Sequence, residues 1–157
     1  MEIKLVLFLP RDAASVPVTR QILDNCLGTL GVVADTRTDI ALALSEACAN
    51  VIQHAGPSDE YEVKAKAVDG RCIIEVENTS STAVALVPTG EPVPPMAEHG
   101  RGLTIIDAVA DNLQLIGNGR KGITTVHFEK ALEYLPGAPG ALLIGHEDGA
   151  APPATGH

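Results

Sequence analysis

An alternating segment that turns at Asp69-Gly70 constrains the fold more than any other feature of the chain. Residues 61–78 read YEVKAKAVDGRCIIEVEN, with an apolar side chain at every second position on both sides of the turn. This period is that of a β-strand with one buried face, and Asp-Gly is a preferred two-residue hairpin turn. A second such segment, LQLIGNGRKGITTVHFEK, turns around Asn118-Gly119. The sequence therefore predicts two antiparallel hairpins.

Three other segments repeat their apolar residues at helical intervals of three and four. A break in the sequence, GVVADTRTD, separates the first from the second, and Thr38 or Asp39 is placed to cap the second helix. The first predicted helix follows capping side chains in residues 11–15 and ends at about Leu30. The second runs from its cap to the stop at Gly56-Pro57, and the third is GRGLTIIDAVADN at 100–112.

The order of these elements predicts an α+β fold. A first strand at residues 2–8 precedes two helices, a hairpin, the third helix and the second hairpin. We expect a two-layer sandwich, with helices on one face of a mixed, mainly antiparallel sheet. One domain is predicted over residues 1–130. From residue 131 the composition shifts to Ala, Gly and Pro, so residues 131–157 are predicted to be a largely disordered tail.

Composition restricts the class of partner. The formal net charge is −9, and an acidic surface repels phosphate backbones, so direct binding to nucleic acid is not expected. An anionic ligand would need a metal ion, a helix N-terminus or individual arginines to neutralise it. No apolar run reaches the length of a membrane span. The three cysteines lie in separate apolar stretches and are expected to be buried, reduced thiols and not a disulfide set or a metal site, which favours a cytoplasmic protein.

The second predicted helix carries Glu46 and Asn50 one turn apart at the border of its apolar face, and His54 follows after another turn. A carboxylate and an amide oxygen in this relation suit Mg²⁺, which prefers oxygen ligands, and a carboxylate can also serve as a general base. A polar helix edge without function is the alternative, with His54 as a capping or packing residue. The motif alone leaves both alternatives open.

Gly100 and Gly102 flank Arg101 at the start of the third predicted helix. Glycines at such a place let backbone N–H groups approach phosphate oxygens, and the helix N-terminus adds favourable partial charge. Arg101 could pair directly with an anion. A simple turn is the alternative, but the proline-rich loop before these glycines and the amphipathic helix after them favour a phosphate site.

The order of these predicted strands, helices and motifs resembles the ATP-binding fold shared by gyrase, the Hsp90 chaperone, histidine kinases and MutL (GHKL). It most resembles the small serine kinases that act as bacterial anti-sigma factors, over about residues 3–130. The segment DIALALSEACANVIQHA is similar to that family's N-box, and HGRGLTIIDAVAD to its second glycine box. The segment ITTVHF is similar to the closing strand whose threonine approaches the adenine.

The resemblance implies ATP and Mg²⁺ as ligands, with Glu46 as the general base and Asn50 as the Mg²⁺ ligand. It implies that residues 79–99 form an ATP lid. It also implies a sigma factor and an anti-anti-sigma (STAS-type) protein as partners, and a homodimer. Arg20 lies on a surface that such kinases use for partners, although an ordinary solvated arginine is the alternative. The other implied ATP-site residues are His54, Asn78, Gly100, Arg101, Gly102, Leu103, and Thr124 or Thr125.

One segment departs from the family pattern. Where the family carries D-x-G-x-G, whose aspartate accepts a hydrogen bond from adenine, this chain has VENTSST. Asn78 takes the aspartate position, with Glu77 as the alternative. An asparagine accepts without charge assistance, so adenine recognition should weaken by roughly 1 kcal/mol.

Two functions follow from these observations. The first is an ATP-dependent anti-sigma serine kinase. The second is a regulatory protein-interaction module of the same fold that binds ATP weakly or is not catalytic. A histidine kinase is disfavoured, because no phosphoacceptor helix is predicted before the first helix. A zinc hydrolase is disfavoured because no H-E-x-x-H occurs.

Overall fold

The computed structural model describes residues 2–54, 60–78, 100–118 and 122–143. The predicted lid at 79–99 and the predicted helix stop at Gly56-Pro57 lie outside these residues. The elements are β1 (Ile3–Pro10), α1 (Ser15–Leu30), α2 (Ala34–His54), β2 (Glu60–Val68), β3 (Arg71–Asn78), α3 (Gly100–Val109), β4 (Asn112–Asn118), β5 (Gly122–Ala131) and α4 (Pro139–Leu143).

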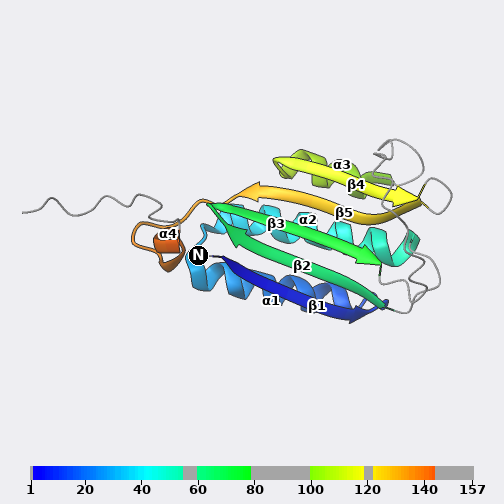
Figure 1. The fold of residues 1–157 in the computed structure, drawn as a ribbon, viewed down its shortest axis with the longest axis horizontal. Helices are drawn as coiled ribbons and strands as arrows, with labels where there is room; N and C mark the ends of the chain where they lie inside the picture. The colour runs from blue at the N-terminus through cyan, green and yellow to red at the C-terminus, as the bar shows by residue number, and fades with distance from the viewer. Residues whose placement is uncertain (1, 55–59, 79–99, 119–121, 144–157) are drawn as a thin grey trace, which may run out of the picture.

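The strands form one sheet in the order β1-β2-β3-β5-β4, and helices cover one of its faces (Figure 1). The predicted two-layer α+β sandwich is confirmed. The sheet is more regular than the mixed one we expected, because every pairing between described strands is antiparallel. Helices α1 and α2 form a helical hairpin that returns the chain to the end where β1 finished, so β2 runs against β1.

Both predicted hairpins are confirmed. Strands β2 and β3 pair from Tyr61–Asn78 to Val68–Arg71, and the residues between them have positive φ angles, 51° at Asp69 and 73° at Gly70. Two positive φ angles make the turn type I′, whose twist matches that of the strands. Strands β4 and β5 pair in the same manner, while residues 119–121 of their turn are not described.

The core lies between the sheet and the helices and is mainly aliphatic. One face of α2 and the inward positions of β2, β3 and β5 supply most of it. Each fully buried Leu, Ile or Val contributes about 1.5–3 kcal/mol through removal of its side chain from water. The largest fully buried side chains are Tyr61, Phe128, Ile40, Leu44, Ile74, Leu103, Ile106, Val32, Val51, Val63, Val76 and Val126.

The start of α2 differs from the prediction. The helix begins at Ala34, so Thr38 and Asp39 lie inside it and do not cap it. Thr38 Oγ1 donates to the backbone oxygen of Ala34 at 3.0 Å. No proline or glycine interrupts this stretch, and the acidic Asp35 in the first turn interacts favourably with the helix N-terminus.

The predicted loose tail differs from the structure over residues 131–143. Strand β5 runs to Ala131, and the backbone N–H of Leu132 donates to the backbone oxygen of Gly70 at 2.8 Å. Tyr134 forms an isolated bridge with Val32, and Leu132 and Ala138 are buried. Composition did not reveal these partners, because all of them are distant in sequence. Residues 144–157 lie outside the described part.

Within the described ranges, no helix has both the length and the apolar content needed to cross a membrane.

Candidate functional site

Helices α2 and α3 pack closely enough to join the two sequence motifs. A Cβ atom placed on Gly102 would lie 2.9 Å from Oε2 of Glu46 and 3.8 Å from its Cβ. Folded proteins essentially never show a Cβ contact shorter than 3.0 Å. Gly102 therefore lies against the Glu46 carboxylate, and only a glycine fits there without displacing it. The third helix begins beside the predicted base.

Asn50 lies one turn beyond Glu46 on α2. Its side chain is only 7 % exposed, and neither Oδ1 nor Nδ2 has a hydrogen-bond partner among the residues that the structure describes. A buried amide left without partners costs about 1–3 kcal/mol. A group retained at such a cost is a candidate for ligand binding. Its amide oxygen is the type of ligand that Mg²⁺ accepts.

Asn78 is the last residue of β3, and Val76, two positions before it, faces the helices. Strand alternation therefore places Asn78 on the helix-covered side of the sheet. Its Oδ1 atom is buried and has no hydrogen-bond partner within the described ranges. The arrowhead of β3 and the C-terminal end of α2 lie at the same end of the sheet (Figure 1). We call this region, with Glu46, Asn50, Asn78 and Gly102, the site end.

The same alternation separates the residues that the sequence left as alternatives. Thr125 pairs with Glu77 on β3 and Ile116 on β4, and the next residue, Val126, is buried against the helices. Thr125 and Glu77 therefore point to the open face of the sheet. The Glu77 carboxylate accepts a hydrogen bond from Lys64 Nζ at 3.0 Å. Asn78, and not Glu77, lies on the side of Asn50.

The remaining predicted residues differ in what the structure shows. Leu103 is 1 % exposed and belongs to the hydrophobic core, so it packs the start of α3 against the protein. His54 is the last residue of α2, while Gly100 and Arg101 open α3. The side chains of His54, Arg101 and Thr124 lie outside what the structure describes.

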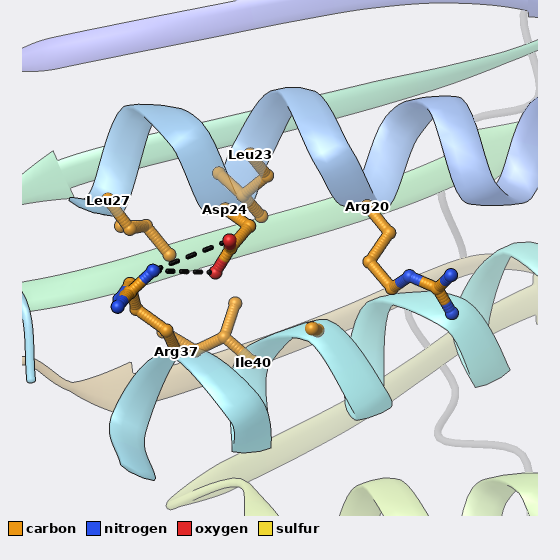
Figure 2. Close-up of a pocket in the computed structure, with 7 residues that line it drawn as sticks. Arg20, Leu23, Asp24, Leu27, Arg37 and Ile40 are labelled. Atoms are coloured by element: carbon orange, nitrogen blue, oxygen red, sulfur yellow. Dashed lines mark hydrogen bonds and ion pairs between the residues drawn. The ribbon is translucent and has the colours of Figure 1, made fainter. Parts of the chain in front are cut away.

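Arg20 is an exposed residue of α1, away from the Glu46–Gly102 contact. It lines a narrow groove between α1 and α2 (Figure 2). An ion pair of 3.3 Å between Arg37 Nη1 and Asp24 Oδ1 crosses this groove, and Figure 2 shows Arg20 further along it, outside that pair. The groove is lined by Arg20, Leu23, Asp24, Leu27, Arg37, Ile40 and Ala41.

Sequence reasoning missed Arg11. Its guanidinium donates to the backbone oxygen of Ile52, in the last turn of α2. A cation at a helix C-terminus is favourable, and this contact fixes the turn that follows Asn50. A single basic residue in the loop after the first strand was the only signal, and it does not reveal such a long-range contact.

A buried polar cluster was also missed. Ser15 Oγ and Tyr61 Oη are 2.6 Å apart, and Thr19 Oγ1 donates to the backbone oxygen of Ser15 at 2.9 Å. Burial raises the pKa of the Cys48 thiol to about 12, although its hydrogen bond with Tyr61 acts in the opposite direction. Burial likewise raises the pKa of the Tyr61 hydroxyl. These groups are neutral near pH 7 and have a packing role.

Comparisons with known proteins show the family to which the chain is similar. The family model described as "Histidine kinase-like ATPase domain" matches residues 9–129. The serine-protein kinase RsbW of Bacillus mycoides (strain KBAB4) is 27 % identical over 123 residues, which cover 72 % of this chain and 77 % of that protein. RsbW of Bacillus cereus (strain B4264) is 26 % identical over 124 residues, with the same two coverages.

One solved structure shares the fold. It is the crystal structure of the RsbU and RsbW domains of Rv1364c from Mycobacterium tuberculosis, with a TM-score of 0.61 and 21 % sequence identity. The match covers 83 % of this chain and 32 % of that longer one.

Proposed function

The chain belongs to the histidine kinase-like ATPase domain family, and from this premise we propose that it is an ATP-dependent protein serine kinase of the anti-sigma type. In this function it binds a sigma factor and transfers the γ-phosphate of ATP to a serine of an anti-anti-sigma (STAS-type) partner. The observation that carries the proposal is the contact between Glu46 and Gly102. Asn50, one turn away, has a buried amide with no hydrogen-bond partner among the described residues. The similarity to RsbW serine-protein kinases supports it.

The residues at the site end fit a magnesium-nucleotide complex. Asn50 would hold Mg²⁺ through its amide oxygen, because that buried side chain has no partner among the described residues. Bound Mg²⁺ neutralises charge that develops on the transferred phosphoryl group. The backbone N–H groups at the start of α3 would face the phosphates, since Gly102 has no side chain in the way.

Glu46 has the role of the base. Its carboxylate can accept the proton of the attacking serine hydroxyl or orient that hydroxyl toward the phosphate. Gly102 holds the start of α3 against this carboxylate, so phosphate and base are positioned by one helix–helix contact. Arg11, through the Ile52 backbone oxygen, keeps the end of α2 in place.

The partner surfaces belong to the same proposal. Arg20 is exposed in the α1–α2 groove and provides a positive charge on an acidic protein, which suits an acidic side chain of a protein partner (Figure 2). The proposed protein is a homodimer. Its proposed location is cytoplasmic, because sigma factors act in the cytoplasm.

A protein-interaction module with weak nucleotide binding is the second candidate. The neutral amide of Asn78 favours it, because an uncharged acceptor binds an amino group less strongly than a carboxylate. Thermal denaturation with Mg·ATP separates the two candidates. A nucleotide present at 100 times its Kd stabilises the folded state by about 2.7 kcal/mol. An unchanged Tm at millimolar Mg·ATP would favour the module.

The kinase activity is tested with Glu46→Gln and a serine-bearing partner recovered from cell extract. The variant should bind ATP with unchanged affinity and transfer phosphate at least about 100-fold more slowly, because the amide cannot accept the proton. Glu133→Gln is the matched control, since Glu133 is an exposed carboxylate on the segment after β5. Phosphate transfer by Glu46→Gln at the wild-type rate would refute the role of Glu46.

A further inference from the structure

Asn78 is half-buried and offers two kinds of hydrogen-bonding group, of which the Oδ1 atom is buried. A carboxamide accepts through Oδ1 and donates through Nδ2, whereas a carboxylate at neutral pH only accepts. Because Asn78 Oδ1 is buried without a partner inside the described ranges, a ligand that donates to it would recover a hydrogen bond. The position therefore differs in kind from one that carries an acidic residue.

Among the residues that the structure describes, no neighbour of Asn78 hydrogen-bonds its Oδ1 atom. Its cross-strand partner on β2 is Tyr61, whose hydroxyl group lies 2.6 Å from Ser15 Oγ. The adjacent Glu77 lies on the opposite face of the sheet and pairs with Lys64. Neither neighbour occupies Oδ1, so a rotation of about 180° of the amide exchanges the acceptor and the donor toward a ligand.

We propose that Asn78 lets the nucleotide site bind purine triphosphates that carry either a 6-amino or a 6-oxo group. This inference rests on the proposed function, since it requires a nucleotide at the site end. With adenine, Oδ1 accepts from the 6-amino group and Nδ2 donates to N1. With a 6-oxopurine, the turned amide donates to the 6-oxo group and accepts from the N1–H.

A carboxylate at this position would discriminate between the two bases. It accepts from the 6-amino group of adenine, but it repels the 6-oxo group and leaves that oxygen without a donor. Sites that hydrogen-bond a polar group reject analogues that leave buried polar atoms unpaired. The choice between the two purine classes therefore depends on one atom of the side chain at position 78, which is nitrogen in asparagine and oxygen in aspartate.

The experiment is isothermal titration calorimetry of the full chain with Mg·ATP and Mg·ITP. Inosine differs from adenosine in the purine edge at C6 and N1, so this pair of ligands isolates the groups that Asn78 would contact. We expect the two Kd values of the wild-type protein to differ by less than about tenfold. Asn78→Asp should raise the preference for ATP by at least roughly tenfold, chiefly through weaker binding of ITP.

Asn25→Asp is the matched control, because Asn25 is exposed on α1 and the substitution adds the same charge. It should leave the ratio of the two Kd values unchanged. Wild-type protein that binds ATP but binds ITP over 100-fold more weakly would overturn the inference and leave the proposed function standing. If Asn78→Asp leaves the ratio of the two Kd values unchanged, the inference is likewise overturned and the proposed function still stands. If neither nucleotide binds, both the inference and the proposed function are overturned.

Discussion

The two ends of the sheet differ in how far their polar groups are hydrogen-bonded. At the end formed by the α1–α2 connection and residues 132–143, which we call the strap end, backbone groups are paired. The N–H of Leu135 donates to Gly31 O at 2.8 Å, the N–H of Val33 donates to Glu133 O at 2.9 Å, and Arg37 Nε donates to Val32 O at 3.2 Å. At the site end, Asn50 and Asn78 have buried polar atoms without partners among the described residues.

The difference indicates a division of roles. Paired and packed groups at the strap end stabilise the folded chain, whereas unpaired groups at the site end lower stability unless a ligand binds. Native proteins pair most buried polar groups, so the exceptions require an explanation. Binding provides one for Asn50 and Asn78, since both lie at the site end. Substitutions at the site end should therefore change binding and catalysis, and those at the strap end should change stability.

The largest expected effect is that of Asn50→Ala. We expect Mg·ATP affinity to fall by more than roughly 100-fold, since the variant lacks the proposed Mg²⁺ ligand. The free energy of unfolding should change by less than about 1 kcal/mol, because the lost packing is offset by removal of two unpaired polar atoms. Calorimetric titration and urea denaturation measure the two quantities, with the exposed Asn25→Ala as control. Undiminished ATP affinity would contradict the proposed role of the site end in binding.

Gly102→Ala should act on catalysis. The added Cβ would displace the Glu46 carboxylate, and a misplacement of about 1 Å can cost roughly 100-fold in rate. The rate of phosphate transfer to the serine-bearing partner is the measurement. Gly28→Ala is the control, because a Cβ there meets only the flexible end of Arg37, at 3.3 Å. Equal rates for the two variants would show that the helix–helix contact does not position the base.

Gly31→Ala tests the strap end. Gly31 has φ of 81°, and an added Cβ would lie 2.3 Å from that of Ala138, so we expect a loss of about 3 kcal/mol in unfolding free energy. Gly137→Ala separates the two causes: its φ is 72° but nothing lies within 4 Å, so it should lose only about 1 kcal/mol. Thermal denaturation measures both. A changed ATP affinity in folded Gly31→Ala would contradict the division of roles.

Alkaline solution should lower the stability of both ends alike. Burial raises the pKa of the thiols of Cys48 on α2 and Cys72 on β3 from 9.0 to about 12. Between pH 9 and 12 the unfolded chain loses protons that the folded chain keeps, so stability is full below pH 9 and falls as pH rises. Thermal denaturation at pH 8 and 10.5 measures the fall.

Cys48→Ala and Cys72→Ala should each reduce this alkaline fall in Tm, and Cys26→Ala, at an exposed position, should not. An equal fall in all three variants would mean that other groups cause it. Burial also raises the pKa of Tyr61, which adds to the fall in the same direction in every variant.

The hairpins were predictable because their determinants are local. Alternation in residues 61–78 and the positive φ angles that Asp69 and Gly70 adopt depend on neighbours in sequence. The first turn of α2 was missed because Ala34 and Asp35 carry little apolar signal. The chain after Ala131 was missed because its partners, Val32 and Gly70, are far away in sequence.

The candidate site was predictable in part. The spacing of Glu46 and Asn50 follows from helical periodicity, and the glycines of α3 follow from their motif. Alternation from Val126 would have excluded Thr125 from the helix side, and the same argument excludes Glu77. The contact of Arg11 with Ile52 joins segments that no periodic pattern connects.

The sequence by itself determined most of the elements before residue 131, the sheet's two hairpins and the residues that share a helix face, because periodicity and turn chemistry act over a few residues. Only the tertiary structure decided that Gly102 lies against Glu46. It also decided that the amide of Asn50 and the Oδ1 atom of Asn78 are buried without partners among the described residues. Burial and hydrogen-bond satisfaction depend on which distant segments pack together. That packing follows from the whole core and not from any one motif.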